Sequence, residues 1–231
     1  QFARPLDFLR ELVQNAIDAG SPRVAVAVQW SEPKAGEDLG VVEIHVQDFG
    51  EGMDERIIDT QLTRMFSSTK EDDLTKIGKF GIGFTSIFAI RPDAVLLRTG
   101  RHGDNWELLF HADRTFDKNR LDEPVSGTLI TLFKRMAPSE VEAFARECRW
   151  VLSWWCEHSN APITFEDRTR TAAPVGADPA DPFAAFSAPP STPQGGPERI
   201  SGPMALETPV QVSHARDGIA VVIGVNDEPA Y

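Results

Sequence analysis

A helix that is apolar on one side only, over residues 6–19, places the first firm limit on the fold of this chain. Its apolar residues recur at helical spacing, and Gly20 with Pro22 ends it. These apolar residues are Phe8, Leu9, Leu12, Val13, Ala16 and Ile17. Because the opposite face is polar, we expect the helix to pack against another layer through its apolar face.

Stretches in which apolar and polar residues alternate predict the strands of that other layer. They cover residues 24–30, 42–47, 94–99, 106–111 and 128–133, with a further short one at 163–165. Gly and Asp clusters separate the strands of the second half, which is typical of an antiparallel meander. Further helices are expected over residues 55–66, 84–90 and 138–158. Together these elements predict a mixed α/β (α+β) sandwich.

The composition divides the chain into three parts. Residues 1–169 hold the elements described above. Residues 170–209 are rich in Pro, Ala, Gly and Ser and contain nine of the 17 prolines, so we expect a flexible linker or a long surface excursion there. Residues 210–231 contain a predicted hairpin that turns at Asp217 and Gly218, and we expect them to begin a second domain.

Length and charge exclude several functional classes. With 231 residues, 41% of them hydrophobic, the chain suffices for one α/β domain and a piece of a second. Because its first residue is Gln1, we interpret it as a fragment of a longer protein.

No apolar run approaches the roughly 20 residues of a membrane span and no signal peptide is visible, so we expect no membrane contact and a cytoplasmic location. The 23 basic and 35 acidic residues give a net charge of -12, which argues against direct nucleic-acid binding by this fragment.

The expected helix over residues 138–158 carries both cysteines and three tryptophans. Cys148 and Cys156 would lie about 12 Å apart on it, too far for a disulfide. Trp150, Trp154 and Trp155 are expected to pack in the core or against another domain, because the helix is amphipathic. The histidines show no metal-ligand spacing to the cysteines, so a zinc site is not expected.

Three polar residues on the first helix form a candidate catalytic stripe. Glu11, Asn15 and Asp18 fall at positions i, i+4 and i+7, so two carboxylates and an amide share one narrow face opposite the apolar one. Taken alone, this pattern is more typical of a solvated polar face than of a site. Other segments must support the functional interpretation.

The second candidate segment is DFGEGMD, residues 48–54. Asp48 ends a strand, and Gly50 with Gly52 lets the backbone turn tightly beside a ligand. A carboxylate held there accepts hydrogen bonds, and adenine presents its exocyclic amine as a donor where guanine presents a carbonyl oxygen. One such carboxylate can therefore select ATP over GTP. The alternative is an ordinary Asp-Gly turn.

The third segment is IGKFGIGF, residues 77–84, which leads into a helix. Its glycines, Gly78, Gly81 and Gly83, expose backbone N–H groups that can hold phosphates, and Lys79 adds a positive charge. The segment is not a Walker P-loop, because the GxxxxGK frame and the following Ser or Thr are absent. By itself it is equally well explained as a structural helix entry.

Taken together, the three segments resemble the GHKL ATPase superfamily, which groups gyrase B, the ninety-kilodalton heat-shock chaperones, histidine kinases and MutL-type proteins. The resemblance covers roughly residues 6–165 and rests on the order and spacing of ELVQNAIDA, DFGEGM and GKFGIGF. It implies the Bergerat fold, in which helices cover one face of a mixed, mostly antiparallel sheet. It also implies that ATP and Mg²⁺ are the cofactors.

The resemblance assigns a role to each motif residue. Glu11 resembles the general base that activates water, and Asn15 resembles the Mg²⁺ ligand. Asp48 resembles the adenine-reading carboxylate, which the hydroxyl of Thr128 in a Gly-Thr pair would support directly or through water. The other residues expected to contact the nucleotide are Asp18, Gly52, Met53, Thr69, Lys79, Gly81, Gly83 and Phe84. Met53 is alternatively an ordinary core residue.

The segment SSTK, residues 67–70, resembles the start of the lid that closes over ATP in the ninety-kilodalton chaperones. Only seven residues separate Lys70 from Gly78, so the lid is short, and Phe66 stands where those chaperones have a basic residue. The remaining catalytic cation of the family belongs to a second domain. We therefore expect slow hydrolysis by this fragment alone.

The leading interpretation is a chaperone-like ATPase in which nucleotide binding drives a conformational change. ATP and ADP are the expected ligands, with a homodimer formed through missing domains and a protein client as further possible partners. The alternatives are an ATP-gated dimerising domain of a DNA-acting protein of the gyrase B, MutL or MORC type, a histidine-kinase ATP domain, and a module that senses ATP without hydrolysing it.

Overall fold

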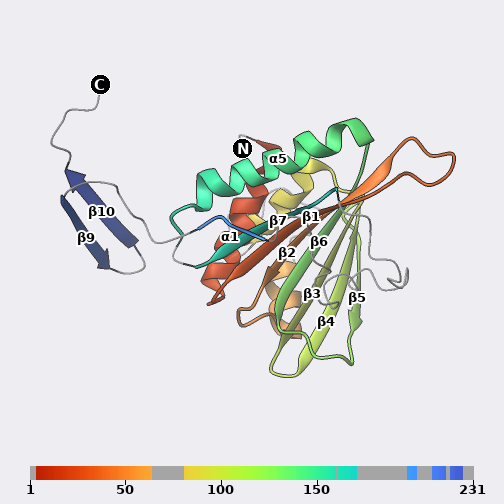
Figure 1. Ribbon diagram of the computed structural model, residues 1–231. Helices are drawn as coiled ribbons and strands as arrows, with labels where there is room; N and C mark the ends of the chain where they lie inside the picture. Colours follow the sequence, from red (N-terminus) through yellow and green to blue (C-terminus); the bar gives the residue numbers. More distant parts are fainter. Residues whose placement is uncertain are drawn as a thin grey trace.

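The computed structural model describes residues 4–63, 81–159, 161–170, 197–201, 210–216 and 219–225. Within these ranges an eight-stranded sheet has the order β5-β4-β3-β6-β2-β1-β7-β8 (Figure 1). Its strands are β1 (Val24–Ser31), β2 (Gly40–Asp48), β3 (Ala94–Arg101), β4 (Asp104–His111), β5 (Phe116–Arg120), β6 (Gly127–Met136), β7 (Ile163–Arg168) and β8 (Glu198–Arg199). Every neighbouring pair is antiparallel except β1 and β7. The predicted mixed, mostly antiparallel sheet is confirmed.

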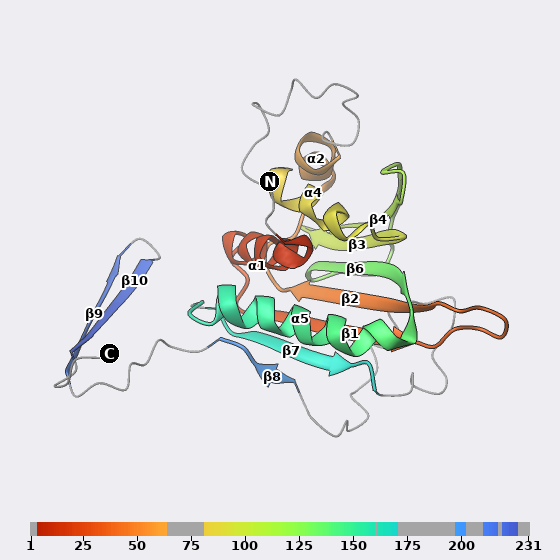
Figure 2. The same ribbon diagram turned by 90° about the horizontal axis from the view of Figure 1, so that it is seen from above.

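The helices lie on one face of this sheet, as Figure 2 shows. They are η1 (Pro5–Asp7), α1 (Phe8–Asp18), α2 (Glu55–Ile57), η2 (Ile58–Leu62), α4 (Gly81–Thr85), η4 (Ser86–Ile90) and α5 (Pro138–Cys156). Helix α1 is central, because it contacts α5, α4 and β2. Its polar stripe therefore lies at the centre of the helical layer.

Two of the predicted helices are less regular than the sequence indicated. The helix expected over residues 55–66 is α2 followed by the wider π-helical turn η2, and its last residues lie outside the described part. The hydroxyls of Thr60 and Thr63 donate hydrogen bonds to the carbonyls of Arg56 and Ile58. Such side-chain bonds compete with the regular backbone hydrogen bonds of an α-helix. The second helix begins earlier than predicted, at Gly81, and tightens into the 3₁₀-helix η4.

The main core fills the space between the sheet and its helices. Alternate residues of β2 and β3 point into it, including Val42, Ile44, Val95 and Leu97, all with 0% exposure. Helix α1 contributes Phe8 and several neighbours to the same cluster. This burial fixes which strand residues face the helical layer, and thus which ones can line a site there.

Helix α5 confirms the predicted range to within two residues but corrects the predicted environment of its tryptophans. Trp150, Trp154 and Trp155 are 42%, 66% and 48% exposed, so packing in the core is wrong for all three. Cys156 rather than Trp155 continues the buried stripe at the end of the helix. Both cysteines are buried and free, as expected.

The end of the chain contains two further pieces of strand structure. In the stretch expected to be a linker or surface excursion, β8 pairs with β7 at the edge of the sheet. Strands β9 (Val210–Arg216) and β10 (Ile219–Val225) form the predicted antiparallel hairpin. The division into domains stays a prediction. Among the described helices, none has the length and apolar character needed to cross a membrane.

Candidate functional site

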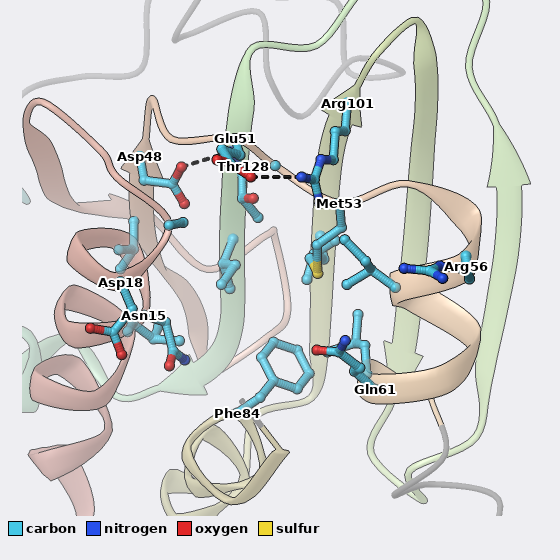
Figure 3. Close-up of a pocket in the computed structure, with 18 residues that line it drawn as sticks. Asn15, Asp18, Asp48, Glu51, Met53, Arg56, Gln61, Phe84, Arg101 and Thr128 are labelled. Carbon is cyan, nitrogen blue, oxygen red and sulfur yellow. Dashed lines mark hydrogen bonds and ion pairs between the residues drawn. The ribbon is translucent and has the colours of Figure 1, made fainter. Parts of the chain in front are cut away.

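A cavity of about 370 Å³ lies between the helices and the face of β2, β3 and β6 that the helices cover. Figure 3 shows Asn15 and Asp18 of α1 on one side of it, Phe84 of α4 at one end, and Arg56 and Gln61 on the opposite side. The strands supply an apolar floor made of Val46, Leu97 and Ile130. A cavity of this size, mostly apolar with a few polar groups, is typical of a small-molecule site.

The loop after β2 is bound to the end of α1. The N–H of Phe49 donates to Ser21 Oγ over 2.9 Å, and the N–H of Glu51 donates to the carbonyl of Ala19 over 3.0 Å. Gly50 is required here, because a Cβ on it would lie 2.6 Å from the same carbonyl oxygen. These contacts hold the two acidic ends of α1 and β2, Asp18 and Asp48, in one cavity wall.

Two backbone N–H groups hold the Asp48 carboxylate in the cavity wall. Its Oδ1 accepts hydrogen bonds from the N–H of Gly50 over 2.9 Å and from the N–H of Thr128 over 3.1 Å. Burial raises the pKa of Asp48 above its usual value, while these two N–H groups and the Thr128 hydroxyl oppose the rise. The two N–H groups thus fix the orientation of the carboxylate through Oδ1, and its other lone pairs can accept from a ligand.

The backbone around Asp48 can approach other strands closely only because two positions are glycine. Gly52 has φ +66, and a Cβ on it would lie 2.1 Å from the carbonyl oxygen of Gly100. Gly127 has φ +72, and its Cβ would lie 2.4 Å from the carbonyl oxygen of Asp48. Side chains at either position would push the loop away from β3 and β6.

Glu11 and Asn15 meet the start of α4 at Gly83. A Cβ on Gly83 would lie 3.3 Å from Glu11 Oε2 and 3.6 Å from Asn15 Nδ2, so the three residues adjoin without spare room. The other carboxylate oxygen of Glu11, Oε1, accepts from the guanidinium of Arg10, with a distance of 3.0 Å from Nε. Arg10 is itself held over the ring of Trp155 at 5.0 Å.

The structure brings most of the predicted site residues together. Asn15, Asp18, Asp48, Gly52, Met53, Phe84 and Thr128 all line the cavity. Glu11 and Gly83 are outside its lining, and both lie beside Asn15, which is part of it. Gly81 begins α4. Thr69 and Lys79, together with the SSTK segment, lie outside the described residues, and their assignment stays a prediction.

Several lining residues were missed by reasoning from the sequence. Arg101 ends β3, and its Nη2 lies 2.7 Å from Glu51 Oε2, so an ion pair links the strand end to the DFGEG loop. Arg56 and Gln61 reach the cavity from α2 and η2. The alternation within the strands predicts the floor residues. Leu97 and Ile130 are each two positions from a buried strand residue, Val95 and Leu132, and therefore lie on the same face of the sheet. No comparable signal marks the two arginines.

The side chains around the cavity offer few ligands for a metal ion. Within the described ranges, no three His, Cys, Asp or Glu side chains gather into a group that could hold a metal ion. Asn15 nevertheless offers an amide oxygen inside the cavity. Such a site fits Mg²⁺ that keeps waters and takes further oxygens from a phosphate-bearing ligand.

Comparisons with known proteins agree with this geometry. A family described as histidine kinase-, DNA gyrase B-, and HSP90-like ATPase matches residues 6–142. This range includes Glu11, Asn15, Asp48, Gly83 and Thr128, and it ends within the first turns of α5.

Individual relatives give a similar result. The chaperone protein HtpG of Pectobacterium atrosepticum is 32% identical over 190 residues, covering 71% of this chain and 30% of that protein. HtpG of Nitrosospira multiformis is 32% identical over 185 residues, covering 69% and 28%. The DNA mismatch repair protein MutL of Chlorobium phaeobacteroides is 37% identical over 107 residues, covering 44% and 16%. The chain therefore spans less than a third of the length of each of these relatives.

Proposed function

This chain belongs to the histidine kinase-, DNA gyrase B-, and HSP90-like ATPases, and on that premise we propose that it binds ATP with Mg²⁺ in the cavity between α1, α4 and the sheet and hydrolyses it slowly. The observation that carries the proposal is the Asp48 carboxylate, held inside the cavity by the N–H groups of Gly50 and Thr128. A fixed acceptor in an otherwise apolar pocket suits the exocyclic amine of adenine.

The part of the cavity around Asp48 and Met53, which we call the base end, offers this one fixed acceptor to adenine. With Oδ1 occupied by two backbone donors, Asp48 directs its remaining lone pairs to a ligand donor. The side chain of Met53 and the floor residues Val46 and Ile130 line the same cavity and supply apolar surface for a flat ring. A guanine carbonyl in place of the amine would face the carboxylate without a proton to share, so GTP is disfavoured.

The phosphate end lies where α1 meets α4. Asn15 would hold Mg²⁺ through its amide oxygen, and the ion would neutralise negative charge on the phosphates. Because Gly83 has no side chain, the backbone of α4 lies close to this amide, whose Nδ2 is 3.6 Å from the position of a Cβ on Gly83. Asp18 remains exposed on the same helix face and lines the cavity nearer Asp48.

Glu11 is the candidate general base for hydrolysis. Arg10 binds Oε1, which leaves Oε2 on the side of Gly83 and Asn15. A carboxylate oxygen held there can orient a water for attack on a terminal phosphate and take its proton. Because the charge that completes the transition state is expected from another part of the full-length protein, slow turnover follows.

The wider role we propose is that of a chaperone-like ATPase, in which nucleotide binding drives a conformational change. It is supported by the two HtpG relatives, which match about 70% of this chain. The MutL relative matches 44% at a higher identity, which keeps an ATP-gated, DNA-acting protein as the second candidate. Salt-dependent DNA binding by the full-length protein would favour the second candidate.

The hydrolysis part of the proposal is tested by Glu11→Gln. We expect turnover at saturating ATP to fall about 100-fold or more, since a positioned base contributes on that order, while ADP affinity stays within about threefold. Glu147→Gln, which changes an exposed carboxylate of α5, serves as the control. Unchanged turnover in Glu11→Gln would show that this residue is not the base.

A further inference from the structure

A second buried threonine stands behind the adenine-reading pair. Thr99 lies in β3 with 0% exposure, directly opposite Thr128 of β6 in the antiparallel register. It faces the helical layer, as Leu97 does, but it does not line the cavity itself. Any effect of Thr99 on a ligand must therefore pass through the residues that it contacts.

The Thr99 hydroxyl makes three contacts around the base end of the site. The N–H of Met53 donates to Thr99 Oγ1 over 2.9 Å. Thr99 Oγ1 lies 3.1 Å from Thr128 Oγ1 and 3.2 Å from the carbonyl oxygen of Gly127. One hydroxyl thus joins the DFGEGM loop to the Gly-Thr pair at the head of β6.

The hydrogen bonds of the two threonines connect the DFGEGM loop to Asp48. While Asp48 is ionised, its carboxylate only accepts, so the Thr128 hydroxyl that bonds to it must donate its single proton there. Thr128 Oγ1 is then an acceptor for Thr99. The single Thr99 proton has two acceptors within reach, Thr128 Oγ1 at 3.1 Å and the carbonyl oxygen of Gly127 at 3.2 Å. Thr99 Oγ1 itself accepts from the N–H of Met53, so the series runs from Met53 through Thr99 and Thr128 to Asp48.

We propose that Thr99 is a positioning residue for adenine recognition, which holds the Thr128 hydroxyl in the orientation that donates to Asp48. This inference rests on the proposed function of the cavity. Hydrogen bonds in series polarise one another, so removing the first hydroxyl weakens the last bond as well as its own. Loss of the Thr99 hydroxyl must therefore lower the affinity for a ligand that donates to Asp48. It must leave the affinity for a ligand without that donor unchanged.

The test compares two ligands in calorimetric titrations. ADP carries the exocyclic amine, whereas purine riboside diphosphate lacks only that amine. We expect Thr99→Val to weaken ADP binding about 3- to 10-fold, as the loss of one or two buried hydrogen bonds predicts, and to leave the weaker analogue nearly unaffected. Thr99→Ser keeps the hydroxyl and is expected to restore the preference for ADP.

Thr131→Val is the matched control. Thr131 is an equally buried threonine of β6, and its hydroxyl lies 3.1 Å from His45 Nδ1 on the other face of the strand. Its removal should leave the ratio of the two affinities unchanged. If valine at position 99 prevents folding, Thr99→Cys replaces it, because a thiol donates only weakly and should give an intermediate loss of preference.

Two outcomes would overturn the assignment. Equal weakening of ADP and the analogue would show that Thr99 acts only through general stability of the sheet. Unchanged ADP affinity in folded Thr99→Val would show that Thr128 needs no support. Failure of the proposed function is distinguishable from both, because the wild-type protein would then bind neither ligand or bind both alike.

Discussion

Glu11 Oε2 lies 3.3 Å from the point that a Cβ on Gly83 would occupy. The atom nearest to this point therefore belongs to the carboxylate that we assign to the attacking water. Asn15, one helical turn further along α1, is almost as close to the same point, at 3.6 Å. Even one additional methyl group would crowd the phosphate end of the site.

Gly83→Ala is accordingly expected to lower turnover more than affinity. The new methyl group must move Glu11 or Asn15 by a few tenths of an ångström, and small displacements of a catalytic group reduce rates strongly, here by about tenfold. ADP affinity should change less than about threefold, because Asp48 is untouched. Steady-state hydrolysis and ADP titration measure the two quantities. Turnover equal to that of the wild type would show that Glu11 does not act at this contact.

Gly52→Ala tests the close approach of the DFGEG loop to β3. Alanine at φ +66 is strained, and its Cβ would lie 2.1 Å from a backbone oxygen that cannot move aside. Gly103→Ala is the matched control, because Gly103 has φ +86 and nothing lies within 4 Å of its Cβ position. We expect Gly52→Ala to lower the free energy of unfolding by about 2 kcal/mol more than Gly103→Ala does.

Chemical denaturation of both variants measures this difference, and ADP titration shows whether the cavity survives. Equal destabilisation by the two substitutions would mean that the loop can withdraw from Gly100 without loss. The loop around Asp48 would then not be held tightly against β3.

The pH dependence of binding follows from Asp48. Burial raises its pKa, against the opposing hydrogen bonds from Gly50 and Thr128. Adenine requires the ionised carboxylate as acceptor, so ADP affinity is full well above this raised pKa and is lost as pH falls through it. The loss should begin at a higher pH than for an ordinary exposed Asp, whose pKa is about 3.9.

Calorimetric titrations at decreasing pH check this expectation. Purine riboside diphosphate is the control ligand, because it lacks the amine that needs the ionised form. Its affinity should vary less with pH than that of ADP. Parallel profiles for the two ligands would contradict the assignment of the acid-dependent loss to Asp48.

The fold and much of the site were open to prediction because both follow from short patterns. Alternation in residues 42–47 places Asp48 at the end of a strand, and the first helix places Asn15 and Asp18 on one face. Their closeness in space was not predictable from these patterns alone. It depends on the hydrogen bonds that tie the loop after β2 to the end of α1. The pairing of β2 with β6 then brings Thr128 to Asp48 across 80 residues.

Other features of the site leave no mark in the sequence. Thr99 looks like any strand threonine until the register sets it opposite Thr128. Arg101 is one of several arginines in polar surroundings, and only the turn of the DFGEG loop brings Glu51 to it. Trp155 continues the helical period of α5, yet it is half-exposed under the guanidinium of Arg10 rather than buried in the core.

The central claim is that Asp48 reads adenine in this cavity. Titration of the wild type and Asp48→Asn with ADP and GDP, with Asp93→Asn as a control for a carboxylate that pairs with Arg135, tests it most directly. We predict that the wild type prefers ADP and that Asp48→Asn loses about 10- to 100-fold in ADP affinity, as expected for a hydrogen bond to a charged group, whereas Asp93→Asn binds normally. Equal affinity of the wild type for ADP and GDP, or an unchanged ADP affinity in Asp48→Asn, would contradict the claim.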